Sequence, residues 1–174
     1  MKTFYVVLVK PKAKFVPFSW LVRWFQGTKY SHCEFNFNIS NRSMYYGAVK
    51  PSVRLSNEHY FLKKYEIIKK FEITVEQEQF NEIRAMVMEY ANSPYPVLET
   101  ICLGVSKLLN IKKNFYCDKR YLKCSELLVR FLDKVADIKR DPEMTDVRDI
   151  DMVLTRLSEI EGSIVKVMGP WDKG

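Results

Sequence analysis

Apolar side chains recur along this chain with two different periods, one of which predicts strands and the other helices. Residues 4–10 form an apolar run rich in β-formers, and residues 30–39 alternate between apolar and polar side chains. A period of two places successive side chains on opposite faces of a strand. The alternating segment therefore predicts a strand with one apolar and one polar face. The apolar face carries Cys33, Phe35, Phe37 and Ile39, and the polar face carries His32, Glu34, Asn36 and Asn38.

Three later segments also predict strands. A turn at residues 41–43 leads into residues 44–49, which predicts a hairpin that Pro51 ends. Residues 65–75 and 163–168 are further strand candidates. Together with the two segments above, they predict an antiparallel sheet of about four to six strands.

Other segments repeat their apolar residues at helical spacing. Ser19 is the predicted N-cap of the first helix, which Gly27 ends. Thr74 and Gln77 form a capping-box pattern before the second helix, which stops at the Asn-Ser-Pro sequence of residues 92–94. The predicted helices cover residues 20–27, 80–91, 98–110, 124–135 and 145–157.

Length and composition predict one domain of the α+β class. The chain has 174 residues, of which 47% are hydrophobic, and it shows no repeat or linker. We therefore expect residues 1–174 to form a single domain, with the antiparallel sheet packed against the helix that begins at Cys124. The apolar run at the N-terminus is followed by Pro11 and lysines and not by a cleavage site, so we expect no signal peptide and a cytoplasmic protein.

The formal net charge of +7 favours an anionic partner. A solvated surface is the simpler interpretation of three basic clusters, but the fourth adjoins Cys124. No aromatic RNP motif or zinc finger indicates nucleic-acid binding. The first three clusters contain Lys10, Lys12 and Lys14; Lys63, Lys64, Lys69 and Lys70; and Lys112 and Lys113, and the fourth contains Lys119, Arg120 and Lys123.

The four cysteines predict free thiols in a reducing compartment. None of them forms a CxxC pair, and their spacing to the two histidines resembles no zinc module. We therefore expect neither a metal nor another cofactor. Cys102 lies on an apolar helix face and Cys33 on the apolar strand face, so both are expected in the core. His59, in a polar, loop-like stretch, is expected at the surface.

Cys124, His32 and Glu34 are candidates for nucleophilic chemistry. A cysteine that begins a helix sits at the positive end of the helix dipole, which favours the thiolate. His32 and Glu34 share a strand face with Cβ atoms roughly 6 to 7 Å apart, so the carboxylate can orient the imidazole. The alternatives are a buried structural cysteine, an ordinary strand histidine and a solvated glutamate.

These residues resemble a known family. A helix followed by a Tyr-Ser-His-x-Glu strand at residues 30–34, and a Cys-Ser-Glu-Leu helix start at residues 124–127, are similar to the circularly permuted papain-like hydrolases of the NlpC type, which include phage and bacterial members. In that group the histidine precedes the cysteine, as here. The resemblance spans roughly residues 18–154, and it implies a permuted papain-like fold.

The resemblance also implies roles for individual residues. Cys124 corresponds to the nucleophile, His32 to the general base and acid, and Glu34 to the third polar member. Tyr30 is similar in position to an aromatic that lines the site, and Lys123 is a candidate for binding an anionic substrate. The stretch at residues 47–54 matches the family pattern only loosely and offers no second site histidine.

The implied reaction is acyl transfer through a thioester to Cys124. The substrate classes that the resemblance implies are amide bonds of cell-wall-type peptides, with lipid esters or amides as the alternative. Two non-enzymatic alternatives stay open: a binding module that uses its basic surface, and a structural protein in which the Cys/His pair is incidental. Distance between the thiol and the imidazole discriminates the last of these. The sequence leaves the oligomeric state open.

Overall fold

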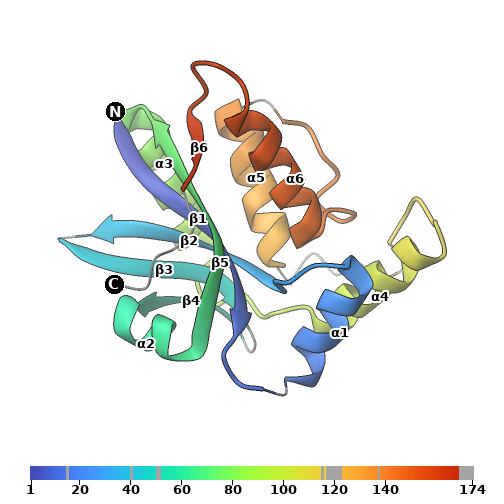
Figure 1. Ribbon diagram of the computed structural model, residues 1–174. Helices are drawn as coiled ribbons and strands as arrows, with labels where there is room; N and C mark the ends of the chain where they lie inside the picture. Colours follow the sequence, from blue (N-terminus) through green and yellow to red (C-terminus); the bar gives the residue numbers. More distant parts are fainter. Residues whose placement is uncertain are drawn as a thin grey trace.

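The computed structural model describes residues 1–14, 16–39, 41–49, 52–114, 116, 123–136 and 138–168, and these residues form six strands and six helices (Figure 1). The fold is α+β, as predicted. The strands are β1 (Lys2–Pro11), β2 (His32–Ile39), β3 (Arg42–Val49), β4 (Ser52–Asn57), β5 (Tyr65–Val75) and β6 (Val165–Val167). The helices are α1 (Pro17–Gln26), α2 (Glu58–Lys64), α3 (Gln77–Glu89), α4 (Val97–Leu108), α5 (Cys124–Ala136) and α6 (Val147–Ser158).

The six described strands form one antiparallel sheet in the order β4-β3-β2-β1-β5-β6. Strand β1 lies at its centre, paired with β2 through Val9 and His32 and with β5 through Phe4 and Ile73. The predicted hairpin of β2 and β3 is confirmed, and Asn41 turns it with a φ of 61°. The strand that carries His32 and Glu34 is thus an interior strand of the sheet.

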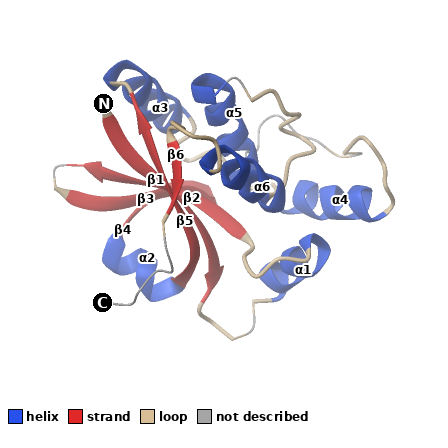
Figure 2. Ribbon diagram, turned by 45° about the horizontal axis from the view of Figure 1, so that its top comes forward, coloured by secondary structure: helices blue, strands red, loops and turns tan. Residues whose placement is uncertain are grey.

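Helices α3, α5 and α6 cover one face of the sheet, over the main core (Figures 1 and 2). Aromatic rings join the helices to the strands in this core. The Phe131 ring of α5 meets Phe4 and Phe35 edge-on, with ring centroids 5.1 and 5.3 Å apart. Such edge-to-face contacts fix the position of α5 on the sheet, and with it the position of Cys124.

The short helix α2 covers the opposite face of the sheet (Figure 1). Its Phe61 ring stacks on Tyr45 with centroids 3.8 Å apart, and both belong to a second apolar cluster. The polar side chains of β2 lie on this side of the sheet but are buried, including His32, Glu34 and Asn36. The alternative that Glu34 is a solvated strand residue is therefore wrong.

The sequence pattern missed β4 and α2. Strand β4 is short and carries Ser52, Arg54 and Ser56 between its apolar positions, so it lacks a run of β-formers. The Asn57 side chain accepts a hydrogen bond from the backbone N–H of Tyr60, which caps α2 in a stretch expected to be a loop. His59 lies exposed on this helix, so its surface position is confirmed.

Two of the predicted helix caps are wrong. Val16 is the N-cap of α1 and Pro17 occupies its first turn, so Ser19 lies inside the helix. The capping box of α3 is formed by Glu76 and Gln79, because β5 continues through Thr74 before the helix begins. The end of α1 at Gly27 is confirmed, with a φ of 61° that favours glycine.

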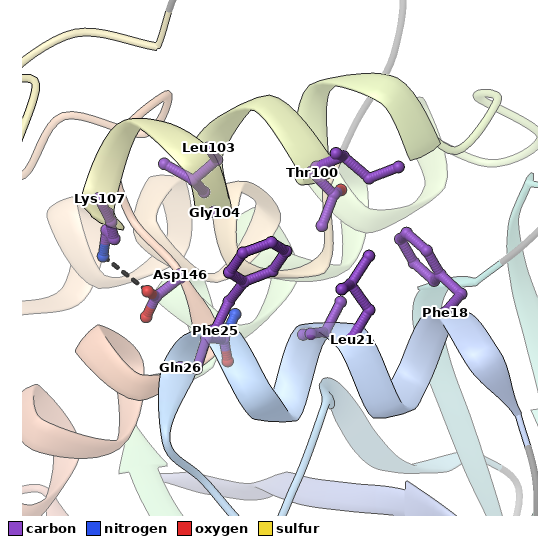
Figure 3. A pocket seen from close by; sticks show the side chains of 11 residues that line it. Phe18, Leu21, Phe25, Gln26, Thr100, Leu103, Gly104, Lys107 and Asp146 are labelled. Carbon is purple, nitrogen blue, oxygen red and sulfur yellow. Dashed lines mark hydrogen bonds and ion pairs between the residues drawn. The ribbon is translucent and has the colours of Figure 1, made fainter. Parts of the chain in front are cut away.

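Helices α1 and α4 pack against each other beside the sheet, and Figure 3 shows the small cavity between them. Phe25 of α1 lies over Gly104 of α4, where an added Cβ would come within 2.8 Å of the ring. At the end of α4, Lys107 forms ion pairs with Asp146 at 2.7 Å and with Asp149. The Asp146 and Asp149 carboxylates also cap α6, so the lysine joins α4 to α6.

Among the described residues, no helix is both long enough and apolar enough to cross a membrane.

Candidate functional site

Cys124 is the first residue of α5 and is buried, with 4% of its surface exposed. The residue after it is anchored, because the Ser125 hydroxyl donates a hydrogen bond of 2.8 Å to the carbonyl of Thr145. The helix packs against β2 and β3. The thiol therefore sits at the positive end of the helix dipole and at the edge of the strand that carries His32.

Lys123 does not fit the substrate-binding role expected for it. Its side chain is 2% exposed, and its ammonium contacts the Glu99 carboxylate at 2.6 Å and donates to the carbonyl of Glu143 at 2.9 Å. Glu99 lies on α4 and Glu143 lies before α6. The lysine is thus a buried structural cation that holds the start of α5 against its neighbours. Lys119 and Arg120, the other members of this basic cluster, lie outside the described residues.

His32 and Glu34 form a buried pair across one strand face, as their spacing predicts. The Nε2 atom of His32 lies 2.8 Å from Oε1 of Glu34, and the two residues are 7% and 3% exposed. This bond orients the ring and occupies Nε2. Nδ1 is therefore the ring nitrogen available to exchange a proton with Cys124.

Gly47 of β3 makes the room that Glu34 occupies. A Cβ built at this glycine would lie 2.4 Å from Cγ and 2.8 Å from Cδ of Glu34. Even alanine at this position would collide with the carboxylate side chain. The neighbouring strand of the hairpin therefore confines the Glu34 side chain.

The Cys124 thiol and the His32 imidazole lie near enough to shift each other's pKa. Burial alone would lower the pKa of His32, but the charge and hydrogen bond of Cys124, followed by those of Glu34, raise it to about 10. The pKa of Cys124 is held well below its usual range, first by a hydrogen bond from Cys33, against burial, and then by the positive charge of His32. These opposite directions favour a thiolate and an imidazolium at neutral pH.

Cys33 adds a second thiol to this site. It is buried in the core, as predicted, but its thiol and backbone also help to lower the pKa of Cys124. Burial, followed by the neighbouring Cys124, raises the pKa of Cys33 well above its usual range. Cys33 therefore keeps its proton and acts as a donor to the Cys124 thiolate.

Tyr30 lies beside the site, but its hydroxyl is directed to α6. It donates a hydrogen bond of 2.6 Å to Oδ2 of Asp151, while Lys69 of β5 donates to the other oxygen of that carboxylate at 2.6 Å. Burial, followed by this hydrogen bond, raises the pKa of Tyr30. The hydroxyl expected to line the site instead fastens α6 to the sheet.

A mostly apolar pocket of about 180 Å³ opens against His32. Val16, Phe18 and Val22 of the α1 region form one wall, and Tyr65 and Tyr95 lie among the other lining residues. The Tyr65 ring lies 6.1 Å from the His32 ring, centroid to centroid. The pocket thus places a largely apolar surface beside the base. Apart from His32, its polar lining groups are the hydroxyls of Ser19, Ser31, Tyr65 and Tyr95, and no lysine or arginine is among the described residues that line it.

Sequence reasoning missed Cys33, Gly47, Tyr65 and Tyr95 as parts of the site. Cys33 was assigned to the core by its strand face, which was correct but said nothing of its partner. The predicted hairpin could have indicated Gly47, because a glycine on the strand next to a buried carboxylate marks a close approach. Tyr95 follows the turn after α3, where no periodic pattern applies.

No protein-family model matches this chain, and no curated protein matches it. Among solved structures, the chain is similar to the crystal structure of metalloprotein YiiX from Escherichia coli O157:H7, DUF1105. The TM-score is 0.56 at 11% sequence identity, and the match covers 97% of this chain and 88% of that chain. At this identity the likeness shows a shared fold alone.

The described residues of this chain contain no group of three or more His, Cys, Asp or Glu side chains placed to hold a metal ion.

Proposed function

We propose that this protein is a thiol-dependent acyl hydrolase with a permuted papain-like fold, in which Cys124 is the nucleophile, His32 the acid and base, and Glu34 the orienting group. One observation carries the proposal. Residues 92 positions apart in the sequence, His32 and Cys124, meet in a buried site where the thiol pKa is lowered and the imidazole pKa is raised. A carboxylate that orients the histidine is typical of a catalytic Cys/His site and is not expected beside an incidental Cys/His pair.

The proposed reaction has two steps. The Cys124 thiolate attacks the carbonyl carbon of an ester or amide, and His32 gives its proton to the departing oxygen or nitrogen, which leaves a thioester. His32, now neutral, then takes a proton from water, and the resulting hydroxide attacks the thioester. The acid product leaves, and the thiolate and imidazolium are restored. Glu34 keeps Nε2 occupied throughout, so that Nδ1 handles each proton.

The N-terminus of α5 supplies the charge stabilisation that such a step needs. The first backbone N–H groups of a helix have no partner within the helix, and Cys124 is the first residue of α5. An oxyanion formed on a carbonyl bound to Cys124 would lie near the N–H of that residue, within the positive end of the dipole.

The pocket favours an apolar acyl group as the substrate. Its lining beside His32 is mostly aliphatic and aromatic, which suits a hydrocarbon chain better than the charged peptides of a cell wall. The buried ion pair of Lys123 also removes the one cation expected to bind an acidic peptide. Esters or amides of fatty acids are therefore the first candidates, and cell-wall-type peptides are the second. The similar YiiX protein is described as a metalloprotein, whereas the proposed steps run through the thiol.

Hydrolysis of a matched series of substrates tests this proposal. Short- and long-chain acyl esters and a muropeptide should be compared for the wild type, Cys124→Ala and His32→Ala. We expect turnover that rises with chain length and disappears in both variants. Cys102→Ala is the matched control, because Cys102 is also buried but lies on α4. Turnover by Cys124→Ala equal to that of the wild type would exclude the thiol mechanism, and absence of turnover by the wild type on all of these substrates would favour the binding-module alternative.

A further inference from the structure

Two tryptophans on α1 are exposed although they are among the largest apolar side chains. Trp20 and Trp24 are 55% and 61% exposed, and their rings stack on each other 6.4 Å apart, nearly parallel at 8°. They lie one helical turn apart, so they share one face of the helix. The face that packs on α4 carries other residues, among them Leu21 and Phe25 (Figure 3). The tryptophans therefore do not hold the two helices together.

Helix α4, which packs against α1, also carries exposed apolar side chains. Leu98 and Leu108 lie on the helix and Leu109 and Ile111 directly after it, and each is at least 41% exposed. The two helices are neighbours in both views of the fold (Figures 1 and 2). We call these four residues, with Trp20 and Trp24, the α1–α4 surface. Exposed apolar side chains gathered on adjacent elements mark an interaction site more often than chance.

The two chain segments that carry the α1–α4 surface hold almost no acidic residues. Residues 11–31 contain no Asp or Glu, and the one acidic residue of segment 97–114 is Glu99, which is buried. The ammonium group of Lys107 forms ion pairs with Asp146 and Asp149, so we do not count it among the basic residues of this surface. The exposed basic residues of these two segments are Lys12, Lys14, Lys29, Lys112 and Lys113.

We propose that the α1–α4 surface docks on an anionic lipid membrane. Tryptophans place their rings at the level of lipid headgroups, and lysines around them are attracted to anionic lipids. The excess positive charge makes a lipid surface a better fit than a second copy of this chain, because two such surfaces would repel each other. This docking goes beyond the proposed reaction and does not depend on it.

The pocket beside His32 is lined partly by residues of α1, so docking through α1 would affect access to that pocket. Val16, Phe18 and Val22 line the pocket beside His32 and belong to α1 or its N-cap. A protein held on lipid by α1 would therefore keep this pocket within reach of acyl chains. This consequence, unlike the docking, rests on the proposed function.

Vesicle binding tests the docking. The protein, carrying Trp171→Phe so that only Trp20 and Trp24 emit, should be sedimented with vesicles of phosphatidylcholine alone and of phosphatidylcholine with phosphatidylglycerol. We expect binding to the anionic vesicles that weakens with salt, and a blue shift of the tryptophan emission on binding. Absence of both would overturn the proposal.

Two variants locate the contact. Trp20→Ala with Trp24→Ala should weaken vesicle binding at least about tenfold, because both rings lose their burial in lipid. Lys112→Glu with Lys113→Glu changes only exposed residues and should also cost at least about tenfold, since each lysine near an anionic surface contributes to affinity. The matched controls are Met88→Ala for the apolar change and Lys134→Glu with Lys166→Glu for the charge change, which lie on α3, α5 and β6. Equal losses in the controls would mean that binding follows net charge or folding, and would refute the assignment.

Two further outcomes complete the test. If the wild type sediments as a dimer without lipid and the tryptophan variant as a monomer, a second copy covers the surface and the membrane proposal fails. Cys124→Ala should bind vesicles as the wild type does. Loss of hydrolysis with retained vesicle binding, or the reverse, therefore separates failure of the proposed function from failure of the docking.

Discussion

Gly47→Ala tests whether the position of Glu34 sets the charge state of the site. The added Cβ would lie 2.4 Å from Cγ of Glu34, whereas ordinary contact begins at 3.4 Å, so the side chain must retreat by about 1 Å. A retreat of that size stretches the 2.8 Å contact with His32 beyond hydrogen-bonding distance. The glycine has no positive φ, so alanine itself fits the backbone.

The expected cost has two parts. Overpacking a buried site costs roughly 1 to 3 kcal/mol, and loss of a hydrogen bond to a charged group costs about 1.5 to 3 kcal/mol. We therefore expect Gly47→Ala to lower the free energy of unfolding by roughly 3 to 6 kcal/mol. The pKa of His32 should fall from about 10, because Glu34 helps to hold the imidazolium.

Urea denaturation and NMR titration of the imidazole protons measure the two effects. The chain has only two histidines, so His59→Gln assigns the signal of His32. The decisive control is Gly47→Ala in a Glu34→Ala background, where no side chain is left to collide with. There the glycine replacement should be neutral or slightly stabilising, since alanine suits a strand better than glycine. An undiminished cost in that background, or an unchanged His32 titration in the single variant, would refute the reasoning.

Three further predictions concern residues around the site. Cys33→Ala removes the thiol that donates to Cys124, so the pKa of Cys124 should rise and its alkylation at neutral pH should slow; an unchanged pH profile would show that Cys33 is only a core residue. Lys123→Met leaves Glu99 charged and buried without its cation and should cost about 3 to 5 kcal/mol in urea denaturation, most of which Lys123→Met with Glu99→Met should recover. If the double variant were no more stable than Lys123→Met, the lost stability would not come from the unpaired charge of Glu99. Tyr30→Phe should lower stability by about 1 to 2 kcal/mol through the lost bond to Asp151, but leave the alkylation rate of Cys124 as in the wild type, and a slower rate would return Tyr30 to the site.

Periodic patterns predicted most of the fold, because burial on one face imposes a period on the sequence. Strand β5 was predicted with its exact limits, and α5 with its start at Cys124. The patterns failed where caps or neighbours decide the structure: α2 depends on the Asn57 cap, and Ser19 looked like a cap while Pro17 began the helix. The interpretation of β2 as a strand with a polar face was correct, but His32, Glu34 and Asn36 on that face are buried.

The candidate site was only partly predictable for the same reason. The pairing of His32 with Glu34 followed from strand geometry, which is local. The roles of Lys123 and Tyr30 depended on partners distant in the sequence, Glu99 and Asp151, which spacing alone does not reveal. Lys123 is adjacent to the nucleophile in the sequence, but its side chain points into the protein interior and stabilises the fold.

The pH dependence of Cys124 alkylation tests the central claim most directly. Iodoacetamide labelling of the folded protein, followed for each cysteine by peptide mass spectrometry, distinguishes Cys124 from the other three cysteines. Because the pKa of Cys124 is lowered, we expect it to react at a nearly constant rate across neutral pH, where an ordinary thiol with a pKa of about 8.5 reacts faster with each rise in pH. In His32→Ala the profile should move toward that of an ordinary thiol. A Cys124 that stays inert, or that titrates like an ordinary thiol with and without His32, would contradict the thiolate–imidazolium site.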